Sequence, residues 1–344
     1  MGTPVPASGR PSVSVIVPAR DEETSLGACL ESLVAQQGIT FEIIVVDDGS
    51  TDRTRAIAES FPEVRVIEPG PLPPGWTGKN NAVTAGAREA RGEWLLFTDA
   101  DTVHKPGSLA CAPAEAKQHH ADLLSYSPEQ EVHGFWEKAV MPVIFAELAR
   151  TYRPSEVSDP RSPAAAANGQ YVLITRSAYD AVGGHASVAT SLLEDVALAR
   201  VVKASGRKIF FRYGGDAVRT RMYRGFRQMR EGWTKNLSLL FPNAVLLAFW
   251  RLLEFALVLA CLIIAARFAL AGDWRHVPLF LVLPLLTVLR VSTARFSRGS
   301  NVLAILGLPV FSYLLLRSKM RYMRGEVSWK GRTYPGSARI KSVS

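Results

Sequence analysis

Four acidic clusters contain side chains whose type and spacing are suited to chemistry. Asp47–Asp52, Thr98–Asp101 and Asp21–Glu23 each follow an apolar stretch, and Glu194–Asp195 opens a helical pattern. A carboxylate at the end of a strand can accept hydrogen bonds from a ribose or a base. Two carboxylates one residue apart can hold a hard cation, which neutralises a diphosphate. The paired carboxylates are therefore suited to a hard cation that neutralises a diphosphate.

Helix capping is the structural alternative for each cluster taken alone. An Asp before a helix accepts a backbone N–H as an N-cap more often than it acts in catalysis. Two Asp residues separated by one position are also common by chance. The order of the clusters along the chain is what distinguishes a functional set.

Alternating strand and helix patterns over the first two hundred residues would position these clusters. Apolar runs rich in Val and Ile predict strands, and apolar residues three and four positions apart predict helices. The expected strands cover residues 13–18, 41–48, 64–67, 93–98, 122–126, 171–174 and 208–212, and the expected helices cover about 24–33, 52–60, 78–90, 136–150 and 194–205. Strands separated by helices predict an α/β fold with a parallel or mixed sheet and with sites at the carboxyl ends of its strands.

Two stretches have no helix or strand periodicity. Residues 1–11 are small, polar and Pro-rich, which predicts a disordered N-terminus without a signal peptide. Residues 154–167 are rich in Pro, Ser and Ala, and a linker is one interpretation. Because the alternation resumes after them, we expect a mobile loop over the site.

The pattern changes to helical and apolar after Gly214. The apolar stripe of the first helix, predicted at 216–241, has arginines on its flanks and consists of Met222, Phe226, Met229, Trp233, Leu237 and Leu240. Such a helix is suited to a membrane interface, and a core helix packed on the sheet is the alternative. Apolar runs follow at 243–271, 276–289 and 302–316, of which the first is long enough to span a bilayer. We expect a transmembrane region at 242–316 and a basic cytoplasmic tail at 317–344.

Basic residues predict the orientation of these segments. Arginines precede the first apolar run, and Arg317, Lys319, Arg321 and Arg324 follow the last. Both flanks should therefore be cytoplasmic, which requires an even number of crossings. Residues 302–316 are the expected exception, because Gly307 and Pro309 could break them into a re-entrant hairpin.

Composition and charge exclude several classes of protein. The chain has 344 residues, 48% of them hydrophobic, which excludes a disordered or collagen-like protein. Its three cysteines lack metal-ligand spacing and exclude a disulfide framework. Residues 1–200 carry 16 basic and 26 acidic side chains, and the remainder carries 24 and 5. Because the basic residues of the second part interrupt apolar runs, a membrane surface is the expected partner and nucleic acid is not.

The ordered motifs closely resemble glycosyltransferase family 2. The series is Val17–Glu22, Val45–Asp52, Gly78–Ala82, Thr98–Asp101, and Gly183–Gly184 with Glu194–Asp195. The resemblance covers about residues 12–235 and implies a GT-A fold: a mixed sheet flanked by helices, followed here by interfacial and transmembrane helices. It also implies an inverting transfer from a nucleotide sugar, usually a uridine diphosphate sugar. The expected catalytic domain is 12–215.

Roles for individual residues follow from this resemblance. Pro18, Ala19, Glu22 and Asp48 would line the nucleotide pocket, and Lys79 would lie near the base or the diphosphate. Asp99 and Asp101 would bind ribose, diphosphate and Mg2+ or Mn2+. Asp195 would be the general base, which takes the proton of an acceptor hydroxyl. If the acceptor is already a carboxylate, the base matters less.

Further motifs resemble the membrane-bound branch that acts on hopanoids or carotenoids. They are Gly75–Lys79, Asn168–Gln170, Gly183–His185 and Trp329–Arg332. This resemblance implies a lipid acceptor, which Glu194 would help to position. Trp329 and Arg332 would fold back on the active site; a basic anchor beside the membrane is the alternative.

One departure from the family argues against polymer synthesis. Processive members carry a Q-x-x-R-W motif on an interfacial helix, whereas this chain has Gln228–Trp233 with the Trp displaced by one position. Arg230 and Trp233 are still predicted to form part of the acceptor rim, and an interfacial aromatic anchor is the alternative for Trp233.

The preferred prediction is a multi-pass enzyme of the inner membrane with its catalytic domain in the cytoplasm. It would transfer a hexose from a nucleotide sugar to a membrane lipid such as a hopanoid or carotenoid. A polyprenyl-phosphate sugar synthase and a polysaccharide synthase are the enzymatic alternatives. A non-catalytic scaffold is disfavoured because Asp48, Asp99, Asp101 and Asp195 are all present.

Overall fold

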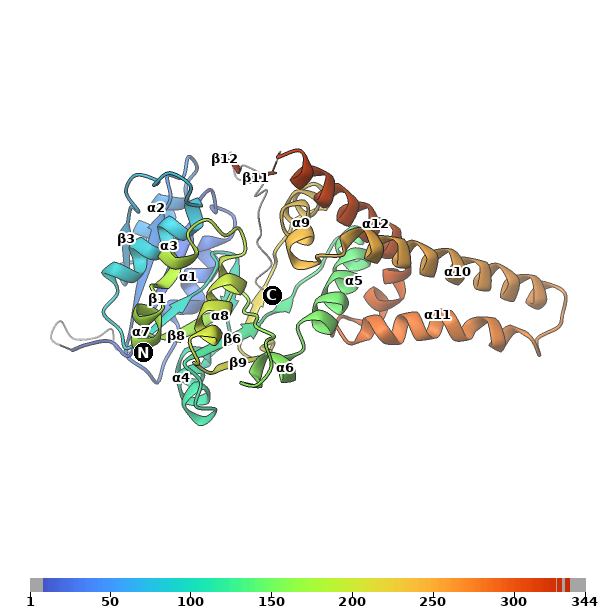
Figure 1. Ribbon diagram of the computed structural model, residues 1–344, viewed down its shortest axis with the longest axis horizontal. Coiled ribbons are helices and arrows are strands. Elements are labelled where there is room, and N and C mark those ends of the chain that lie inside the picture. The colour runs from blue at the N-terminus through green and yellow to red at the C-terminus, as the bar shows by residue number, and fades with distance from the viewer. Residues whose placement is uncertain (1–8, 326, 330–331, 335–344) are drawn as a thin grey trace. The chain divides into compact units, whose positions relative to one another are not determined.

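The structure, a computed structural model, describes residues 9–325, 327–329 and 332–334 (Figure 1). The chain forms two compact units. Unit 1 comprises the chain up to Glu131 together with Tyr152–Met222, and unit 2 comprises Val132–Thr151 and the chain from Tyr223. The expected catalytic domain 12–215 therefore differs from unit 1 in two places: residues 132–151 belong to unit 2, and residues 216–222 belong to unit 1.

A seven-stranded mixed sheet forms the centre of unit 1. Its strands, in spatial order, are β3 (Val64–Ile67), β2 (Phe41–Asp47), β1 (Val13–Ala19), β4 (Trp94–Phe97), β8 (Val172–Thr175), β6 (Leu123–Ser127) and β9 (Ile209–Tyr213). Only β8 runs antiparallel to its neighbours. In the register of the parallel strands, Ala19 pairs with Asp47 and Ile16 with Phe97. The acidic residues that follow β2 and β4 therefore meet at one edge of the sheet.

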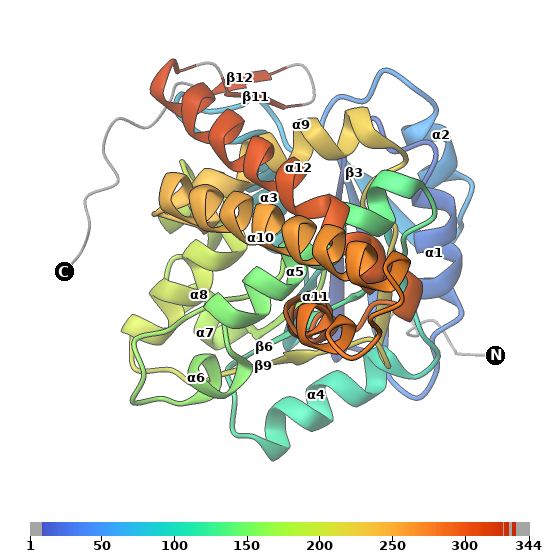
Figure 2. The ribbon, with the colours of Figure 1, turned by 90° about the vertical axis from the view of Figure 1, so that its right-hand side faces the viewer.

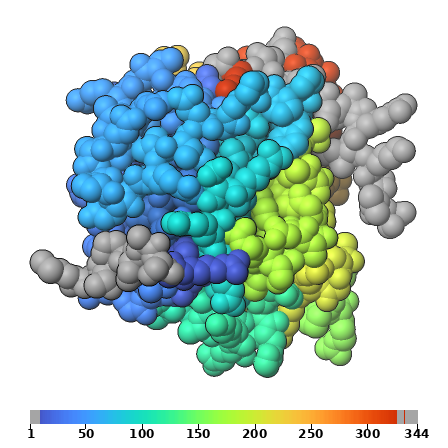
Figure 3. Space-filling view, turned by 90° about the vertical axis from the view of Figure 1, so that its left-hand side faces the viewer, coloured from blue at the N-terminus to red at the C-terminus, as the bar shows by residue number. Residues whose placement is uncertain are grey.

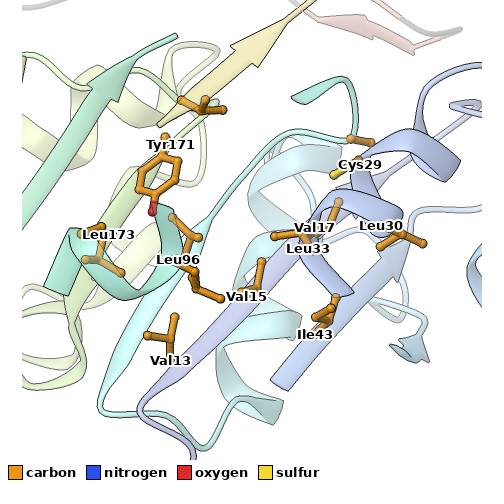
Figure 4. Packing of buried hydrophobic residues seen from close by; sticks show 14 of the residues in the cluster. Val13, Val15, Val17, Cys29, Leu30, Leu33, Ile43, Leu96, Tyr171 and Leu173 are labelled. Carbon is orange, nitrogen blue, oxygen red and sulfur yellow. The ribbon is translucent and has the colours of Figure 1, made fainter. Parts of the chain in front are cut away.

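Helices cover both faces of this sheet. One face packs on α1 (Leu26–Val34), α2 (Thr54–Glu59) and α4 (Ser108–Gln118). The other packs on α3 (Gly78–Glu89), α6 (Pro154–Ser158), α7 (Arg176–Ala181) and α8 (Glu194–Ala204). Because both faces are buried, the central strands are continuous apolar runs. Figure 4 shows Cys29, Leu30 and Leu33 of α1 packed over the strand residues Val17 and Ile43.

A small second sheet and a 3-10 helix are the remaining elements described in unit 1. A small sheet consists of β5 (Thr102–His104), β10 (Val218–Thr220) and β7 (Glu129–Gln130). A 3-10 helix, η1 (Gly184–Val188), lies beside α3. The space-filling view shows yellow-green residues near 180–200 adjoining cyan residues near 80 on one face (Figure 3).

Most helices and strands predicted for this unit are confirmed, with ends that differ from the structure by no more than two or three residues. The predicted mobile loop at 154–167 is wrong in two places. Pro154 begins a short helix, where its missing N–H costs nothing. Ala165–Ala167 are buried in the core beneath α8, because methyl side chains fit that narrow space.

Five helices and a strand pair are described in unit 2. They are α5 (Phe135–Thr151), α9 (Phe226–Leu240), α10 (Ala244–Leu270), α11 (Val277–Ser292), α12 (Arg298–Met323), β11 (Val327–Trp329) and β12 (Arg332–Tyr334). Within this unit α5 packs on α12, and α10 and α11 run side by side (Figures 1 and 2). The apolar face of α5 explains why residues 132–151 belong here.

The predicted interfacial helix at 216–241 needs two corrections. The helix begins only at Phe226, since β10 occupies Val218–Thr220. From Met229 onward its apolar stripe is buried inside unit 2, where the Trp233 indole N–H donates to Met141 Sδ of α5 at 3.3 Å. The stripe is therefore covered by protein, as in the alternative core-helix interpretation, although it packs on α5 and α12 and not on the sheet.

The predicted re-entrant hairpin at 302–316 is also wrong. Helix α12 is continuous from Arg298 to Met323, a length of 26 residues, and Pro309 lies inside it. A Cβ at Gly307 would lie 1.9 Å from the carbonyl oxygen of Ala139, so the missing side chain lets the α5 and α12 backbones touch. This packing along α12 offsets the hydrogen bond that Pro309 cannot make.

Two described helices, α10 and α12, are long and apolar enough to cross a membrane. In the most apolar part of α10 only 11% of residues are buried, against 50% in α12. Helix α11 is shorter, with 16 residues. Large apolar side chains thus remain exposed mainly on the α10–α11 pair.

A cluster of paired charges ties the base of the α10–α11 pair to α5. Glu147 of α5 is fully buried and accepts from Arg290 of α11 at 2.7 Å. Arg290 also contacts Glu254 of α10 at 3.0 Å, and Glu254 pairs with Arg251. Arg251 and Glu254, which interrupt the first apolar run, are therefore neutralised within unit 2.

Candidate active site

A small pocket at the carboxyl edge of the unit 1 sheet brings together residues from several motifs. Its lining residues are Pro18, Lys79, Val83, Phe97, Thr98, Asp99, Gly169, Val172, His185, Glu194, Asp195 and Leu198. The end of β4 supplies Asp99, the first turn of α3 supplies Lys79, and the first turn of α8 supplies two carboxylates. Five predicted site residues, Pro18, Lys79, Asp99, Glu194 and Asp195, therefore share one pocket.

Lys79 lies among three carboxylates. Its Nζ is 2.6 Å from Asp99 Oδ1 and 2.6 Å from Glu194 Oε1. Burial alone would lower the pKa of the Lys79 ammonium, but Asp99, Glu194 and Asp195 hold that pKa well above its usual range. The pocket therefore contains one firmly held positive charge among three acids.

Asn80 holds the two sides of the pocket together. Thr77 caps α3 by accepting from the Asn80 backbone N–H at 3.2 Å. The Asn80 side-chain amide donates to the carbonyl oxygens of Val188, Ala189 and Ser191 at 3.0–3.1 Å. These bonds position the segment that leads into α8. Of these two neighbours, Lys79 is therefore a charged residue of the site and Asn80 is a structural residue.

Asp195 is half-buried and accepts two backbone hydrogen bonds. Gly169 N–H donates to its Oδ2 at 2.7 Å, and Val196 N–H donates to its Oδ1 at 2.8 Å. Burial and the neighbouring charge of Glu194 raise the pKa of Asp195 to about 6. The carboxyl is therefore mostly ionised at pH 7 and can accept a proton near neutrality.

The helix-capping alternative does not describe Asp195. The N-cap position of α8 is Leu193, without a side-chain cap, and Asp195 bonds only the next N–H within its own helix. Capping and turn formation do describe other members of the acidic clusters. Asp47 accepts from the Ser50 N–H at 3.2 Å, and Asp52 accepts from the Thr54 N–H at 2.9 Å.

Asp48 and its neighbours lie where β1 and β2 end. The Asp48 N–H donates to the Ala19 carbonyl at 2.8 Å, and Arg20 donates to the Asp48 carbonyl at 2.8 Å. The Glu22 N–H donates to Thr54 Oγ1 at 2.7 Å. Ala19, Glu22 and Asp48 are therefore beside, but not part of, the pocket lining, and their nucleotide-binding role stays a prediction.

Asp99 and Asp101 have the donor chemistry of a cation site completed by substrate. Among the residues that the structure describes, no group of three or more His, Cys, Asp or Glu could hold a metal alone. Mg2+ commonly takes one or two carboxylates together with substrate phosphates. The Asp101 carbonyl accepts from Thr220 of β10 at 3.1 Å, which anchors this turn. The two carboxylates thus fit a cation that arrives with a diphosphate.

The predicted acceptor residues outside α8 belong to unit 2. Trp233 is buried there against Met141, Phe145 and Tyr223, so the prediction of an exposed rim or interfacial anchor is wrong for its indole. Arg230 is half-buried on α9. Arg332 lies in β12, and Trp329 lies in β11 with its side chain outside the described part of the chain. Acceptor roles for these three remain predictions.

Gly169 and His185 also line the pocket and were not among the predicted site residues. A Cβ on Gly169 would lie 3.2 Å from Lys79 Nζ and 3.3 Å from Asp195 Oδ2, so a side chain here would press on both groups. His185 is buried, its Nδ1 lies 3.0 Å from the Tyr179 hydroxyl, and its ring meets Phe97 edge-on. Burial lowers the pKa of His185 to about 4. The sequence motifs Asn168–Gln170 and Gly183–His185 contain these two residues and could have identified them as site residues.

Comparisons with known proteins agree with this geometry. Residues 14–183 match the family model described as glycosyl transferase family 2. The 4,4'-diaponeurosporenoate glycosyltransferase of Staphylococcus aureus strain MRSA252 is 29% identical over 338 residues, which cover 94% of this chain and 88% of that protein. Its counterpart from strain USA300 is 28% identical over 339 residues, with the same coverage.

A solved structure shows the same fold. A mannosyltransferase from Pyrobaculum calidifontis, in complex with GDP-Man and Mn2+, superposes with a TM-score of 0.52 at 18% identity. The match covers 93% of this chain and 89% of that one. The predicted family and the GT-A fold class are confirmed.

Proposed function

Because residues 14–183 belong to glycosyl transferase family 2 and the chain is thus a glycosyltransferase, we propose that it transfers a hexose from a nucleotide diphosphate sugar to a carotenoid. The observation that carries this proposal is the pocket in which Asp195 faces the Lys79–Asp99 pair. The S. aureus relatives, named for a carotenoid acid, support the acceptor class. A hopanoid remains the second acceptor of the same lipid class.

The proposed reaction is an inverting transfer with Asp195 as the base. An acceptor oxygen attacks the anomeric carbon while the bond from that carbon to the diphosphate breaks. Asp195 takes the proton of an acceptor hydroxyl, and its backbone bonds from Gly169 and Val196 hold the carboxylate in place. A carboxylate acceptor has no proton to remove and would depend less on Asp195.

The leaving diphosphate needs positive charge. Lys79, in the first turn of α3, supplies one such charge beside Asp99. A divalent cation, when bound, supplies the rest, and Asp99 with Asp101 are the residues that would hold it. The Mn2+ in the P. calidifontis mannosyltransferase supports this cation class.

Membrane attachment is part of the proposal. We propose that α10 and α11 cross the inner membrane as a hairpin with the catalytic unit in the cytoplasm. The low burial of α10 supports lipid contact, and its 27 residues extend about 40 Å, enough for the hydrocarbon core. A lipid acceptor would then reach the enzyme without leaving the bilayer.

Transfer assays with the full chain in membranes test the function. Labelled UDP-glucose and GDP-mannose are offered with carotenoids that carry either a hydroxyl or a carboxyl group, and a hexose mass gain is sought. Asp195→Asn should reduce kcat with a hydroxyl acceptor by about 100- to 10,000-fold. This corresponds to about 3–5 kcal/mol in the barrier. Donor affinity should hardly change, and excess chelator should stop turnover until Mn2+ or Mg2+ is added.

Asp180→Asn, an exposed carboxylate of unit 1, serves as the matched control and should keep wild-type turnover. Absence of transfer to any lipid by the wild-type chain would overturn the proposed function. Wild-type turnover of Asp195→Asn on a hydroxyl acceptor would remove Asp195 from the reaction but leave the function intact.

A further inference from the structure

The turn before η1 is built to hold one histidine ring against the pocket. Gly183 and Gly184 have φ angles of +74° and +54°, which side chains rarely allow. A Cβ on Gly184 would lie 2.4 Å from the ring of Tyr179. The two glycines therefore let Tyr179 lie directly against the turn, where its hydroxyl reaches His185.

The Tyr179 hydroxyl engages one of the two ring nitrogens of His185. The His185 backbone N–H donates to the Tyr179 hydroxyl oxygen at 3.1 Å, and that oxygen lies 3.0 Å from His185 Nδ1. Because Thr84 also interacts with this hydroxyl, Tyr179 can either donate its single hydrogen to Nδ1 or accept from Nδ1. In both arrangements Nδ1 is engaged, and Nε2 can donate or accept the second hydrogen bond of the neutral ring.

Nε2 is the nitrogen left for a ligand. It has no hydrogen-bond partner among the residues that the structure describes, although His185 is only 3% exposed. His185 also lines the pocket that contains Asp99, Glu194 and Asp195. A ring nitrogen at the wall of a polar pocket can form a hydrogen bond with a hydroxyl group of a ligand.

We propose that His185 forms the floor of the sugar subsite, where its Nε2 forms a hydrogen bond with a hydroxyl of a neutral hexose carried by the nucleotide. The inference rests on the proposed function and names the sugar class for that site. In such a transfer the anomeric carbon must lie between the diphosphate, near Asp99, and the base Asp195. The part of the donor that reaches His185 in the same pocket is therefore the sugar ring.

The charges around the pocket exclude an acidic sugar. Asp99, Glu194 and Asp195 supply three carboxylates, and Lys79 is already paired with two of them. A uronic acid would add a further negative charge there, and a neutral imidazole could not compensate for it. Hydroxyl groups are uncharged, so the carboxylates do not repel them, and they can form a hydrogen bond with Nε2.

Binding to the full chain in detergent, measured by calorimetry, separates the sugar from the nucleotide. UDP and UDP-glucose are the probes, and GDP and GDP-mannose replace them if the uridine pair does not bind. His185→Phe keeps an aromatic ring and removes the ring nitrogen that would form the hydrogen bond. It should weaken binding of the nucleotide sugar about 5- to 50-fold and leave the nucleoside diphosphate unchanged. His185→Gln, which can place an N–H near the Nε2 position, should recover most of the loss.

Two further measurements complete the test. His119→Phe, which alters a histidine stacked on Phe210 outside the pocket, should change neither affinity. UDP-glucuronic acid should bind the wild-type chain no more tightly than UDP. Equal losses for nucleotide and nucleotide sugar, no loss in His185→Phe, or tight binding of the glucuronate would each overturn the inference. Failure of the wild-type chain to bind any of these nucleotides would instead overturn the proposed function.

Discussion

At the scale of single residues, the proposed role of the pocket depends on how burial and neighbouring charges shift the pKa of Asp195. Burial and Glu194 raise the pKa of Asp195 to about 6, while Lys79 lowers it. A general base must be ionised, so kcat/KM for a hydroxyl acceptor should rise with pH through about 6 and level off above it. Glu194→Gln removes a charge that raises this pKa, so the acidic limb should move to lower pH. The measurement is the pH profile of kcat/KM for both proteins.

Glu63→Gln provides the control, because Glu63 is exposed and distant from the pocket lining. Its profile should superimpose on that of the wild-type chain. An acidic limb that stays in place in Glu194→Gln would contradict the coupling between Glu194 and Asp195.

At the scale of elements, α12 contains two glycines in opposite surroundings. A Cβ on Gly307 would lie 1.9 Å from the Ala139 carbonyl oxygen of α5, whereas nothing lies within 4 Å of one on Gly299. Gly307→Ala must push two backbones apart and should lower the stability by about 1–3 kcal/mol or more. Gly299→Ala should be neutral or stabilising by about 0.5–1 kcal/mol, since alanine favours a helix. Thermal unfolding of both variants in detergent measures the difference. Equal melting temperatures would mean that α5 and α12 are not in contact.

At the scale of the whole molecule, the uneven charge predicts which ends lie in the cytoplasm. Arginines concentrate on α9 and at the end of α12, while the turn between α10 and α11 contains Arg275 and the exposed Trp274. In a Cys261→Ala background, a cysteine at Arg275 should react with an impermeant maleimide from outside intact cells. A cysteine at Arg321 should react only after the membrane is opened.

The exposed Cys111 of unit 1 is an internal reference for the cytoplasmic side, because it too should react only in opened cells. Labelling of Arg321→Cys from outside would mean that α12 crosses as well. Protection of Arg275→Cys would mean that the hairpin enters the bilayer without crossing it.

The alternation of elements, the strand ends and the family were readable from the sequence because they depend on local patterns. Runs such as Val13–Ala19 and Phe41–Asp47 are β-branched and apolar throughout, which predicts central strands, and parallel strands place the residues after them at one edge. A motif and its position predicted in this way that Asp99 and Asp195 belong to the site, and both line the same pocket. The apolar length of α10 likewise predicted a helix that could span a bilayer.

Tertiary structure decided the features that depend on contacts between distant segments. Gly169 donates to Asp195 across 26 residues, and the hydrogen bond that holds the His185 ring requires Tyr179 and a glycine turn together. Helix α5 joins unit 2 because its partners come from α9, α11 and α12, more than 70 residues later in the chain. The burial of Trp233 and the continuity of α12 follow from that packing. Periodicity reports which face of a helix is apolar, but only the folded chain determines whether protein or lipid covers it.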